Sequence, residues 1–346
     1  MKTVYFRVDG NEIIATGHIM RCLSIAKKIQ LLGGKVQFIL ADNSPEELIR
    51  QHGFECIILK SIWNDLEQET GQMVSLIKRR RAKVLFVDSY YVTEYYLQTL
   101  SQYTKVVYLD DLKRFIYPVH TIINYGLWEK NEYEIEIYRK NGLSTKFLLG
   151  PQYIPLREEF NKVLVNIRPL VKSVLITTGG TDQLHVARKL LDAVVGNLEL
   201  DNIEYHVIVG CFNKDREELY KIKQNNTNVH IHENVRNMSY WMEQCDVAVS
   251  AAGTTLYELA ACGIPTVCVE VADNQRGADK WQKEGYMLYA GNVADNMKVC
   301  IENVVKDIVR YKNNLELRNN YSKKMQQLVD GGGAERIARY LLDLQY

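Results

Sequence analysis

Two glycine-rich segments in the second half of the chain have the composition of phosphate-binding turns. Each follows an apolar, β-branched run, and small residues there let backbone N–H groups approach an anion. A following helix adds about half a positive charge at its N-terminus. Neither segment has the GK[ST] ending of a P-loop or the GxGxxG pattern of a dinucleotide fold. The candidate substrate-binding residues are Gly180, Thr181 and Asp182 in LITTGGTD, where they follow Gly179, and Gly253, Thr254 and Thr255 in SAAGTTLYEL.

Glu258 lies three and four residues beyond Thr255 and Thr254, hence on the same face of the predicted helix and one turn further along. If phosphates occupy the turn, the Glu258 carboxylate can accept hydrogen bonds from two ribose hydroxyls, as the acidic residue of a dinucleotide fold does. The alternative is a solvated helix glutamate. We favour the ribose contact because two glycine turns precede this residue in the chain.

A third candidate segment, VEVADNQRGADKW, follows the next predicted strand. Asn274 and Gln275 offer neutral donors and acceptors suited to sugar hydroxyl or acetamido groups, and we expect both to contact the ligand. Asp273 is also polar, but we expect it to be the N-cap of the helix that follows.

In the first half, Gly17 and His18 follow the first predicted strand and a loop that carries Asp9. The positive end of a helix dipole favours the neutral imidazole, which is the form that a general base needs near pH 7. Alternatively, His18 is a helix-start residue satisfied by solvent. Arg21 lies one turn further along, where it could bind phosphate or pair with Asp9.

The segment VLFVDSYYV brings Asp88 and Tyr90 to the end of another predicted strand. Both reach the same rim as His18 if the strands run parallel, and Tyr90 could then orient a sugar or the base. Because the chain contains 22 tyrosines, the residue type alone carries little weight.

Alternating strands and helices must position these residues. The first 125 residues contain predicted helices after Gly17, after Ser44 and over 66–79, and the predicted strands TVYFRV, VQFIL, CIIL, VLFVD, KVVYLDD and TIINY. This alternation predicts an α/β fold with helices on both faces of a parallel sheet. Ligands of such sheets bind beyond the carboxyl ends of the strands, where the motifs lie.

A second alternation begins at SVLITTGGT and continues through YHVIVG, VHIHENV, VAVSAAGTT and PTVCVEV, and helical stretches over 294–310, 314–328 and 332–344 end the chain. The charged residues 128–146 and the prolines of GPQYIPLREEF separate the two halves. We expect two doubly wound, Rossmann-like domains facing an interdomain cleft. The predicted domains are 1–150 with the base, 151–328 with the nucleotide, and a helix in 329–346 that could pack back on the first domain.

The composition excludes several classes of protein. Apolar residues make up 47% of the chain, and 43 basic against 42 acidic residues give a net charge of +1, so no overall field favours nucleic acid or a membrane surface. No apolar run approaches the roughly 20 residues of a membrane span, and MKTVYFRV is too short for a signal peptide. We expect a monomer with no nucleic-acid partner.

The cysteine and histidine patterns give no sign of a metal centre. The seven cysteines are scattered without CxxC pairs, which indicates buried free thiols in a reducing cytoplasm. No HExxH is present, and HIH at 230–232 is typical of a polar strand face. We therefore expect neither a metal nor a cofactor.

Taken in order, GHIMRC, VDSYYV, LDD, GPQYIPLREEF, TTGGTD, SAAGTTLYELAACGIPTVCVEVADNQ and WQKEGY make the chain resemble a known family. The family is that of the UDP-sugar hydrolases of pseudaminic acid biosynthesis, which cleave UDP-2,4-diacetamido-2,4,6-trideoxy-β-L-altropyranose. The likeness spans essentially residues 3–290. More distantly, the second half looks like the UDP-N-acetylglucosamine transferase of peptidoglycan synthesis, and the resemblance implies the GT-B fold of both.

The resemblance implies a UDP-sugar substrate and a role for each matching residue. His18 would activate water for attack at the anomeric carbon, releasing UDP and the free sugar with inversion, and Tyr90 and Asn274 would be its active-site partners. Glu258 would bind the ribose, and the two threonines at 254 and 255 would hold the pyrophosphate.

The chain departs from the family after the first glycine turn. The family often carries Pro and Asn there, whereas this chain has GGTDQLHVARKL, so His185 stands where an asparagine contact is expected. Two other functions compete with hydrolysis. A GT-B glycosyltransferase would use the same UDP site but deliver the sugar to an acceptor hydroxyl. A nucleotide-sugar-binding protein that has lost catalysis is disfavoured by the presence of His18.

Overall fold

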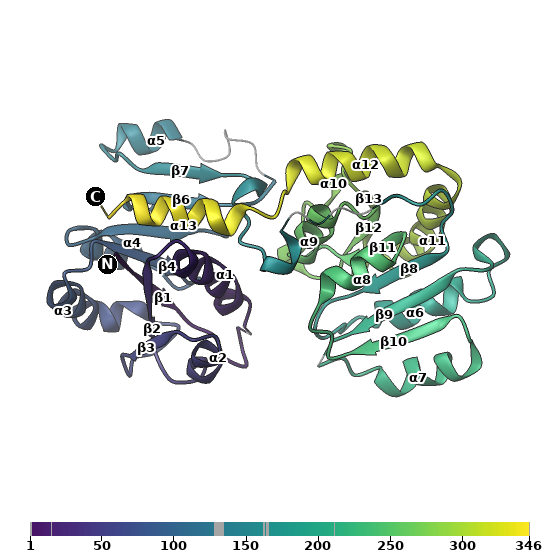
Figure 1. Cartoon of the computed structure of the whole chain (residues 1–346), viewed down its shortest axis with the longest axis horizontal. Coiled ribbons are helices and arrows are strands. Elements are labelled where there is room, and N and C mark those ends of the chain that lie inside the picture. Colours follow the sequence, from purple (N-terminus) through teal and green to yellow (C-terminus); the bar gives the residue numbers. More distant parts are fainter. Residues whose placement is uncertain are drawn as a thin grey trace. The chain divides into compact units, whose positions relative to one another are not determined.

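Two parallel sheets organise the chain, one in each of two units (Figure 1). The first unit comprises Met1–Glu158 and Gly331–Tyr346, and the second comprises Glu159–Asp330. The computed structural model describes residues 2–14, 16–127, 135–161, 163, 166–210 and 212–345, with only the backbone at Asn274.

The sheet of the first unit has the strand order β3-β2-β1-β4-β5-β6-β7, with all neighbouring strands parallel. Its strands are β1 Thr3–Val8, β2 Lys35–Leu40, β3 Glu55–Ile58, β4 Val84–Asp88, β5 Lys105–Leu109, β6 Thr121–Asn124 and β7 Lys146–Leu149. Its helices are α1 Gly17–Leu31, α2 Glu46–Gln51, α3 Thr70–Arg80, α4 Glu94–Ser101, α5 Ile135–Lys140 and α13 Gly333–Asp343, with short 3-10 turns at Leu66–Glu69 and Pro151–Tyr153.

Aromatic packing holds the centre of this sheet in register. Phe6 of β1 is paired with Phe38 of β2 and with Phe86 of β4, and the ring centroids lie 5.5 and 4.8 Å from that of Phe6. All three side chains are fully buried. Cross-strand aromatic pairs stabilise a sheet beyond the burial of their area, so this row fixes the alignment of the strands whose carboxyl ends carry the candidate base.

The last helix, α13, lies against α1 in the first unit (Figure 1). Lysines at the amino ends of three strands donate to the carbonyls that end this helix. Lys2 Nζ lies 2.9 Å from Leu342 O, and Lys105 Nζ lies 2.8 Å from Leu344 O. Lys83 donates to the next carbonyl, at 2.9 Å. Cations stabilise the negative end of a helix dipole, so these contacts anchor the end of the chain to the sheet.

The sheet of the second unit has the order β10-β9-β8-β11-β12-β13, again all parallel. Its strands are β8 Ser173–Thr177, β9 Glu204–Val209, β10 Val229–Glu233, β11 Val247–Ala251, β12 Thr266–Glu270 and β13 Leu288–Asn292. Its helices are α6 Val186–Val194, α7 Arg216–Asn225, α8 Met238–Gln244, α9 Thr255–Cys262, α10 Asp279–Lys283, α11 Met297–Asn313 and α12 Leu315–Leu328. Short 3-10 turns occur at Leu198–Leu200 and Asp273–Gln275, and another, at Glu158–Phe160, spans the unit boundary.

The predicted fold class is confirmed, because both sheets are parallel and doubly wound. All eleven strands named from the sequence exist, but β7 and β13 were not predicted. Strand β7 has four residues and follows a charged stretch, and β13 contains Gly291 and Asn292, residue types that are depleted in strands.

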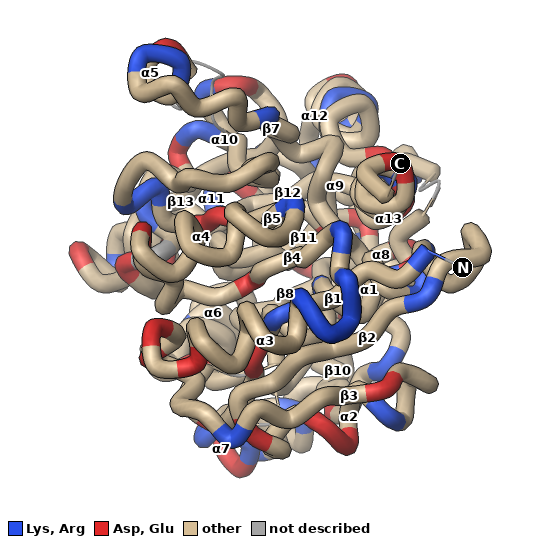
Figure 2. The backbone as a smooth tube through the Cα atoms, turned by 90° about the vertical axis from the view of Figure 1, so that its left-hand side faces the viewer, with Lys and Arg blue, Asp and Glu red and all other residues tan. Residues whose placement is uncertain are grey.

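The surface charges, the cysteines and the helix lengths follow from the described structure. Charges of both signs are distributed along the chain, with a basic run at the end of α3 (Figure 2). Of the six described cysteines, Cys56 is only half-buried and the other five are buried; Cys211 lies outside the described residues. In the described part of the chain, none of the helices combines the length and the apolar character that crossing a bilayer requires.

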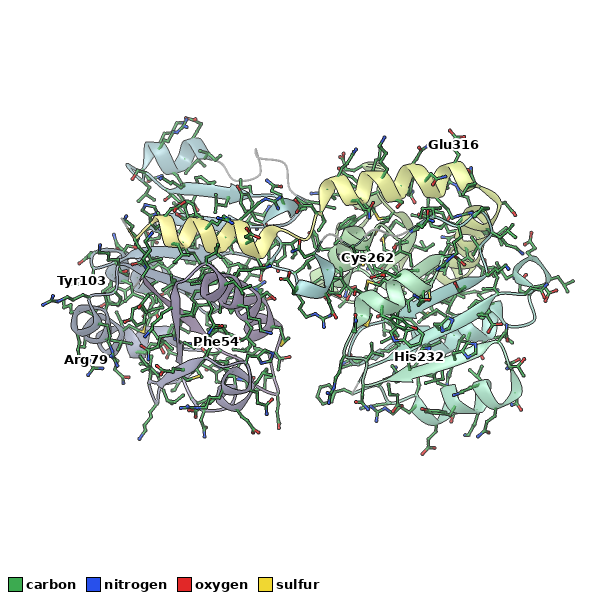
Figure 3. The ribbon with its side chains drawn as sticks, in the orientation of Figure 1. Phe54, Arg79, Tyr103, His232, Cys262 and Glu316 are labelled. Carbon is green, nitrogen blue, oxygen red and sulfur yellow. The ribbon has the colours of Figure 1, made fainter. Side chains whose placement is uncertain are left out.

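The HIH segment lies on β10, in the second unit, where His232 is labelled in Figure 3. His232 Nε2 is 3.0 Å from Nδ1 of His206 on β9, and its ring packs 3.7 Å from that of Trp241. His230 Nε2 lies 2.5 Å from Glu204 Oε2, an acidic partner that the sequence did not indicate. Among the described residues, no group of three His, Cys, Asp or Glu side chains could hold a metal ion.

Candidate active site

His18 is bound to a buried carboxylate at the carboxyl edge of the first sheet. It is the second residue of α1, and its Nδ1 lies 2.6 Å from Oδ1 of Asp88, the last residue of β4. His18 is only 6% exposed, so the alternative of a solvated helix-start histidine is wrong. Because an ionised carboxylate is an acceptor only, the Nδ1 proton faces Asp88 and leaves Nε2 as the basic nitrogen of the neutral ring.

Arg21 holds Asp88 in its ionised form. Arg21 Nε and Nη2 donate to the two carboxylate oxygens at 2.6 and 2.5 Å. Burial alone would raise the pKa of Asp88, but the charge of Arg21, the charge of His18 and the hydrogen bonds from both lower it well below its usual range. The carboxylate is therefore ionised at neutral pH, and it keeps the His18 ring in one orientation.

The partners of Arg21 do not include Asp9, the pairing that the sequence left open beside a phosphate contact. Besides Asp88, Arg21 Nη2 donates to Asp111 at 2.8 Å and Nη1 donates to the Tyr125 hydroxyl at 2.6 Å. Its guanidinium is thus occupied by two carboxylates and a phenol. The suggested pairing with Asp9 is wrong, because that carboxylate is bound by Arg7 and by the Ala41 amide.

Asp9 belongs to a second buried network under the same edge. Its carboxylate accepts from Arg7 at 2.5 Å and from the Ala41 amide at 2.9 Å. Arg7 is fully buried and also donates to both oxygens of Glu69, at 2.6 and 2.9 Å, while the Tyr96 hydroxyl donates to Glu69 at 2.9 Å. Arg7 and Glu69 were missed from the sequence, since Arg7 is one residue of an apolar strand and its partner is 62 positions away.

Tyr90 lies beside His18, with the ring centroids 4.5 Å apart in an edge-to-face arrangement. Burial, followed by the negative charge of Asp111, raises the pKa of Tyr90 to about 12, so its hydroxyl keeps its proton at neutral pH. A pocket opens at this point of the first unit, lined by Asp9, Ile14, His18, Asp88, Ser89, Tyr90 and Tyr91. The pocket therefore brings together three of the predicted site residues and the carboxylate that orients one of them.

In the second unit, the first glycine turn follows β8 and packs against the loop that follows β9. Gly179 has φ +89°, a left-handed conformation that favours glycine. A Cβ built at Gly210 would lie 2.3 Å from Gly180 O, so only glycine allows this approach. The importance of Gly210 was missed, although its place directly after a predicted strand was a usable signal.

Asp182 serves as a helix cap at the end of this turn. Its two carboxylate oxygens accept hydrogen bonds from the amides of Val186 and Ala187, at 2.9 and 3.0 Å, at the start of α6. Asp182 is 7% exposed and adopts φ +44°. Both oxygens are therefore occupied, whereas Gly180 and Thr181 are exposed and accessible to a ligand.

The second glycine turn, at Gly253, leads directly into α9. Thr254 precedes the first helical residue, Thr255, and neither the helix start nor the turn is capped by a side chain. Glu258 lies in the first turn of α9 and is half-buried. The start of α9 thus has no side-chain cap on its backbone amides, and the half-buried Glu258 lies in its first turn.

Gln275 lies next to this second turn. Its Oε1 accepts from the Val271 amide at 2.9 Å, which fixes the side-chain amide, and its Nε2 is 3.8 Å from a Cβ built at Gly253. Gln275 thus points a donor at the turn. The Asn274 side chain, to which a catalytic role was assigned, lies outside the described residues.

The expected capping role of Asp273 is wrong. Its carboxylate is exposed and accepts from Arg276, with the closest contact at 3.0 Å. The helix α10 begins six residues later, at Asp279, and its N-cap is Ala278. The loop is held instead by Glu270, which was missed. Glu270 is 5% exposed and accepts from the Ala278 amide at 2.9 Å.

Known proteins are similar to parts of this chain in sequence and in fold. Residues 174–331 match the glycosyltransferase family 28 C-terminal domain. Among solved structures, MurG of Acinetobacter baumannii is similar to this chain with a TM-score of 0.71 and 13% identity, over 99% of this chain and 100% of that one. The fold is GT-B. The two doubly wound sheets are its two Rossmann-like domains.

Curated relatives extend the comparison by sequence. The pseudaminic acid cytidylyltransferase and UDP-2,4-diacetamido-2,4,6-trideoxy-β-L-altropyranose hydrolase of Helicobacter pylori is 24% identical over 95% of this chain and 53% of its own length. The spore coat polysaccharide biosynthesis protein SpsG of Bacillus subtilis is 24% identical over 58% of this chain and 59% of its own length. The GT-B chain described here thus spans a little over half the length of these two relatives.

Within each domain of this GT-B fold, the predicted residues gather at the carboxyl ends of neighbouring strands. In the first domain, β1 and β4 are adjacent and carry Asp9 and Asp88, while Gly17 begins the helix that presents His18. In the second, β8, β11 and β12 are adjacent and end at the two glycine turns and at the loop with Gln275. In open parallel α/β sheets, ligands generally bind at this edge.

Proposed function

We propose that this protein hydrolyses a UDP-linked diacetamido trideoxy sugar, UDP-6-deoxy-AltdiNAc, to UDP and the free sugar in pseudaminic acid (nonulosonic acid) biosynthesis. The observation that carries this proposal is the buried His18–Asp88 pair at 2.6 Å in the pocket of the first unit. A histidine whose Nδ1 is held by a carboxylate presents its other nitrogen as a general base, and water is the smallest nucleophile that such a base can activate.

The proposed reaction divides its tasks between the two units. His18 Nε2 removes a proton from water, whose oxygen attacks the anomeric carbon as the bond from that carbon to the UDP oxygen breaks. Attack from the face opposite the leaving group inverts the configuration. The glycine turns at Gly180 and Gly253 hold the diphosphate, so backbone amides stabilise the charge that develops on UDP. A diphosphate is already a good leaving group, which reduces the need for a protein acid.

The relatives support a nucleotide-sugar substrate. The second unit matches a glycosyltransferase family 28 domain, and the printed name of the Helicobacter pylori relative includes cleavage of this UDP-sugar. That name also includes a cytidylyltransferase activity, which transfers a nucleotide rather than consuming water. The base and pocket described here suit the hydrolase activity.

An acceptor-free assay tests the proposal. Purified protein is incubated with a panel of UDP-sugars, and UDP release and the anomeric configuration of the first-formed sugar are followed by NMR. We expect release without acceptor or added metal, with the altrose-type diacetamido sugar preferred and with inversion. His18→Ala should lower kcat by about 10² to 10⁴-fold while UDP still binds. Equal turnover by wild type and His18→Ala would remove the base assignment.

A UDP-sugar-dependent GT-B glycosyltransferase is the second candidate. The match of residues 174–331 to a glycosyltransferase domain favours it, and the same base could deprotonate an acceptor hydroxyl. The assay separates the two functions, because a transferase releases UDP only when an acceptor alcohol is added.

A further inference from the structure

The pocket beside His18 in the first unit has the size of a single water molecule. Its volume, counted as the space that the centre of a water can occupy, is about 10 Å³. This is close to the least space that one water needs, and a water is held there only where several polar groups face it. Asp9, His18 and Asp88 all line this cavity, so the three side chains border the same small volume.

The carboxylate of Asp88 is fully occupied by other partners. Its Oδ1 accepts from His18 Nδ1 at 2.6 Å and from Arg21 Nη2 at 2.5 Å. Its Oδ2 accepts from Arg21 Nε at 2.6 Å and from the Cys22 thiol at 3.5 Å. A carboxylate has about four acceptor positions, so these contacts fill them. The Asp88 side chain is also 0% exposed, and it therefore orients His18 without accepting from a ligand.

Asp9 keeps acceptor capacity at the same cavity. Its Oδ2 accepts from Arg7 at 2.5 Å, and its Oδ1 accepts from the Ala41 amide at 2.9 Å. Within the described chain these are its hydrogen bonds, which leaves a further acceptor position on each oxygen. The side chain is 6% exposed, against 0% for that of Asp88. Asp9 is therefore the carboxylate that a small molecule in the cavity can contact.

A buried cation fixes the orientation of Asp9. The fully buried Arg7 donates through Nε and Nη2 to the two oxygens of Glu69, and through Nη1 to Asp9. Burial raises the pKa of Asp9, while the charge of Arg7 and the hydrogen bonds from Ala41 and Arg7 oppose that rise. Because the guanidinium is held by two bonds to Glu69, its third bond keeps the Asp9 carboxylate in place.

An ordered loop after β1 brings Ile14 to this cavity and leaves Ile13 in solvent. The Asn11 side chain accepts from both amides, at 2.9 Å for Ile13 and 3.0 Å for Ile14, which is a local turn that fixes the loop. Ile13 is 78% exposed, whereas Ile14 is half-buried and lines the cavity. A branched apolar side chain at a cavity of this size limits it to a small guest.

We propose that this cavity binds the nucleophilic water, whose two protons are accepted by His18 Nε2 and by Asp9, and that Ile14 excludes larger nucleophiles. The inference rests on the proposed function for the electrophile, the anomeric carbon of a UDP-sugar. One proton moves to His18 Nε2 as the water oxygen attacks that carbon, and UDP leaves with the electron pair of the broken C–O bond. The second proton stays on the oxygen, held by Asp9, and becomes that of the new anomeric hydroxyl. Arg7 and Glu69 are positioning residues that act through Asp9.

Competition between water and methanol tests the exclusion of larger nucleophiles. The protein is incubated with the UDP-sugar in buffer containing methanol, and NMR measures the ratio of methyl glycoside to free sugar. The wild type should form free sugar almost alone. Ile14→Ala should raise the ratio by at least about tenfold, the effect of a methyl-sized change in an apolar pocket. Ile13→Ala is the matched control, because this exposed side chain does not line the cavity, and it should keep the wild-type ratio.

Asp9→Ala tests the contact with water. The variant retains the Arg7–Glu69 pair, and kcat should fall by about 10- to 100-fold, the loss of one hydrogen bond to a charged acceptor, with UDP affinity unchanged. The rate is counted per UDP-binding site, so a smaller folded fraction does not enter it. The product ratio in methanol is likewise independent of the folded fraction. Unchanged kcat in Asp9→Ala would remove Asp9 from the site.

A crystal structure of the substrate-free protein separates this inference from the proposed function. We expect one ordered water within about 3.2 Å of both His18 Nε2 and an Asp9 oxygen. If this water is present and no UDP-sugar is cleaved, the proposed function fails, while the water-binding site is supported. If the UDP-sugar is hydrolysed but no water bridges the two residues, or Ile14→Ala keeps the wild-type ratio, the inference is overturned and hydrolysis stands.

Discussion

His18 Nδ1 lies 2.6 Å from Asp88 Oδ1, although 70 positions separate the two residues in the chain. The pairing joins the start of α1 to the end of β4, two elements that meet only because β1 and β4 are neighbours in the sheet. Asp88 is 1% exposed, so its charge is balanced by the guanidinium of Arg21 rather than by solvent, and His18 donates a hydrogen bond to it. The orientation of the proposed base therefore depends on a buried carboxylate that lines the same pocket.

Asp88→Asn should test whether the carboxylate is needed to orient the His18 ring. The amide keeps the shape of the carboxylate but no longer fixes the Nδ1 proton, so we expect kcat to fall by about 10² to 10⁴-fold with little change in UDP affinity. Removing one partner of a buried ion pair should also cost about 3–5 kcal/mol of unfolding free energy, measured by urea denaturation. Asp111→Asn, which alters a carboxylate that contacts Arg21 and the Tyr90 hydroxyl but not His18, should keep most of the rate. A larger rate loss in Asp111→Asn than in Asp88→Asn would contradict this assignment.

Tyr90→Phe should have a smaller effect than loss of the base. The ring that packs against His18 remains, while the hydroxyl beside Asp111 is removed. We expect kcat/KM to fall by about tenfold, the size of one lost hydrogen bond to the substrate. Because the pKa of Tyr90 is raised to about 12, the rate profile between pH 6 and 9 should keep its shape. Tyr91→Phe, in the same pocket, serves as the control.

Glu258→Gln should weaken nucleotide binding rather than chemistry. If the carboxylate accepts from the ribose hydroxyls, its loss removes charge-assisted hydrogen bonds of about 1.5–3 kcal/mol, or roughly 10 to 100-fold in UDP affinity. The wild type should bind 2′-deoxy-UDP more weakly than UDP, and the variant should discriminate less between them. Glu316→Gln on the exposed face of α12, labelled in Figure 3, should change neither affinity. Unchanged UDP affinity in Glu258→Gln would refute the ribose role.

Gly210→Ala should disturb the first glycine turn. Its new Cβ would lie 2.3 Å from Gly180 O, which is backbone and must move. Overpacking of this kind costs about 1–3 kcal/mol, to be measured by chemical denaturation, and UDP affinity should fall with it. Gly71→Ala is the matched control, since a Cβ there meets nothing within 4 Å and an exposed helical alanine should stabilise α3 by up to about 1 kcal/mol.

Stability should decline in mild acid because of the histidines on β9 and β10. Burial, followed by the charges of His206, His230 and Lys223, lowers the pKa of His232 to about 4. The folded state therefore takes up a proton less readily than the unfolded state, whose histidine titrates near about 6.5. The contribution of His232 is intact above the unfolded value and is lost as the pH falls from about 6.5 towards 4. His232→Gln should flatten this decline in urea denaturation followed by Trp241 fluorescence; an unchanged slope would contradict the assignment.

Hydrophobic pattern was sufficient to predict most of the fold, because parallel strands buried on both faces are continuous apolar runs such as VLFVD. The hydrophobic pattern did not predict β13, because LYAGN has few strand-forming residues and forms a strand by pairing with β12. The turn residues of the sequence correctly predicted that His18 lies at the start of a helix and that Gly180 and Gly253 follow strands. The partners of charged residues were not predictable in the same way. Asp9 had a nearer cation in Arg7, and only the folded sheet brings Arg21 to Asp88.

The return of α13 to the first unit has a consequence for synthesis. A chain made from its amino end exposes residues 1–158 on the ribosome long before residues 331–346 exist, so the face of α1 that α13 covers waits for the whole second unit to be translated. During that interval the nascent first unit has an uncovered apolar surface, of the kind that chaperones bind. The second unit is therefore fully synthesised before the first unit has all of its residues, and the second unit can finish folding first.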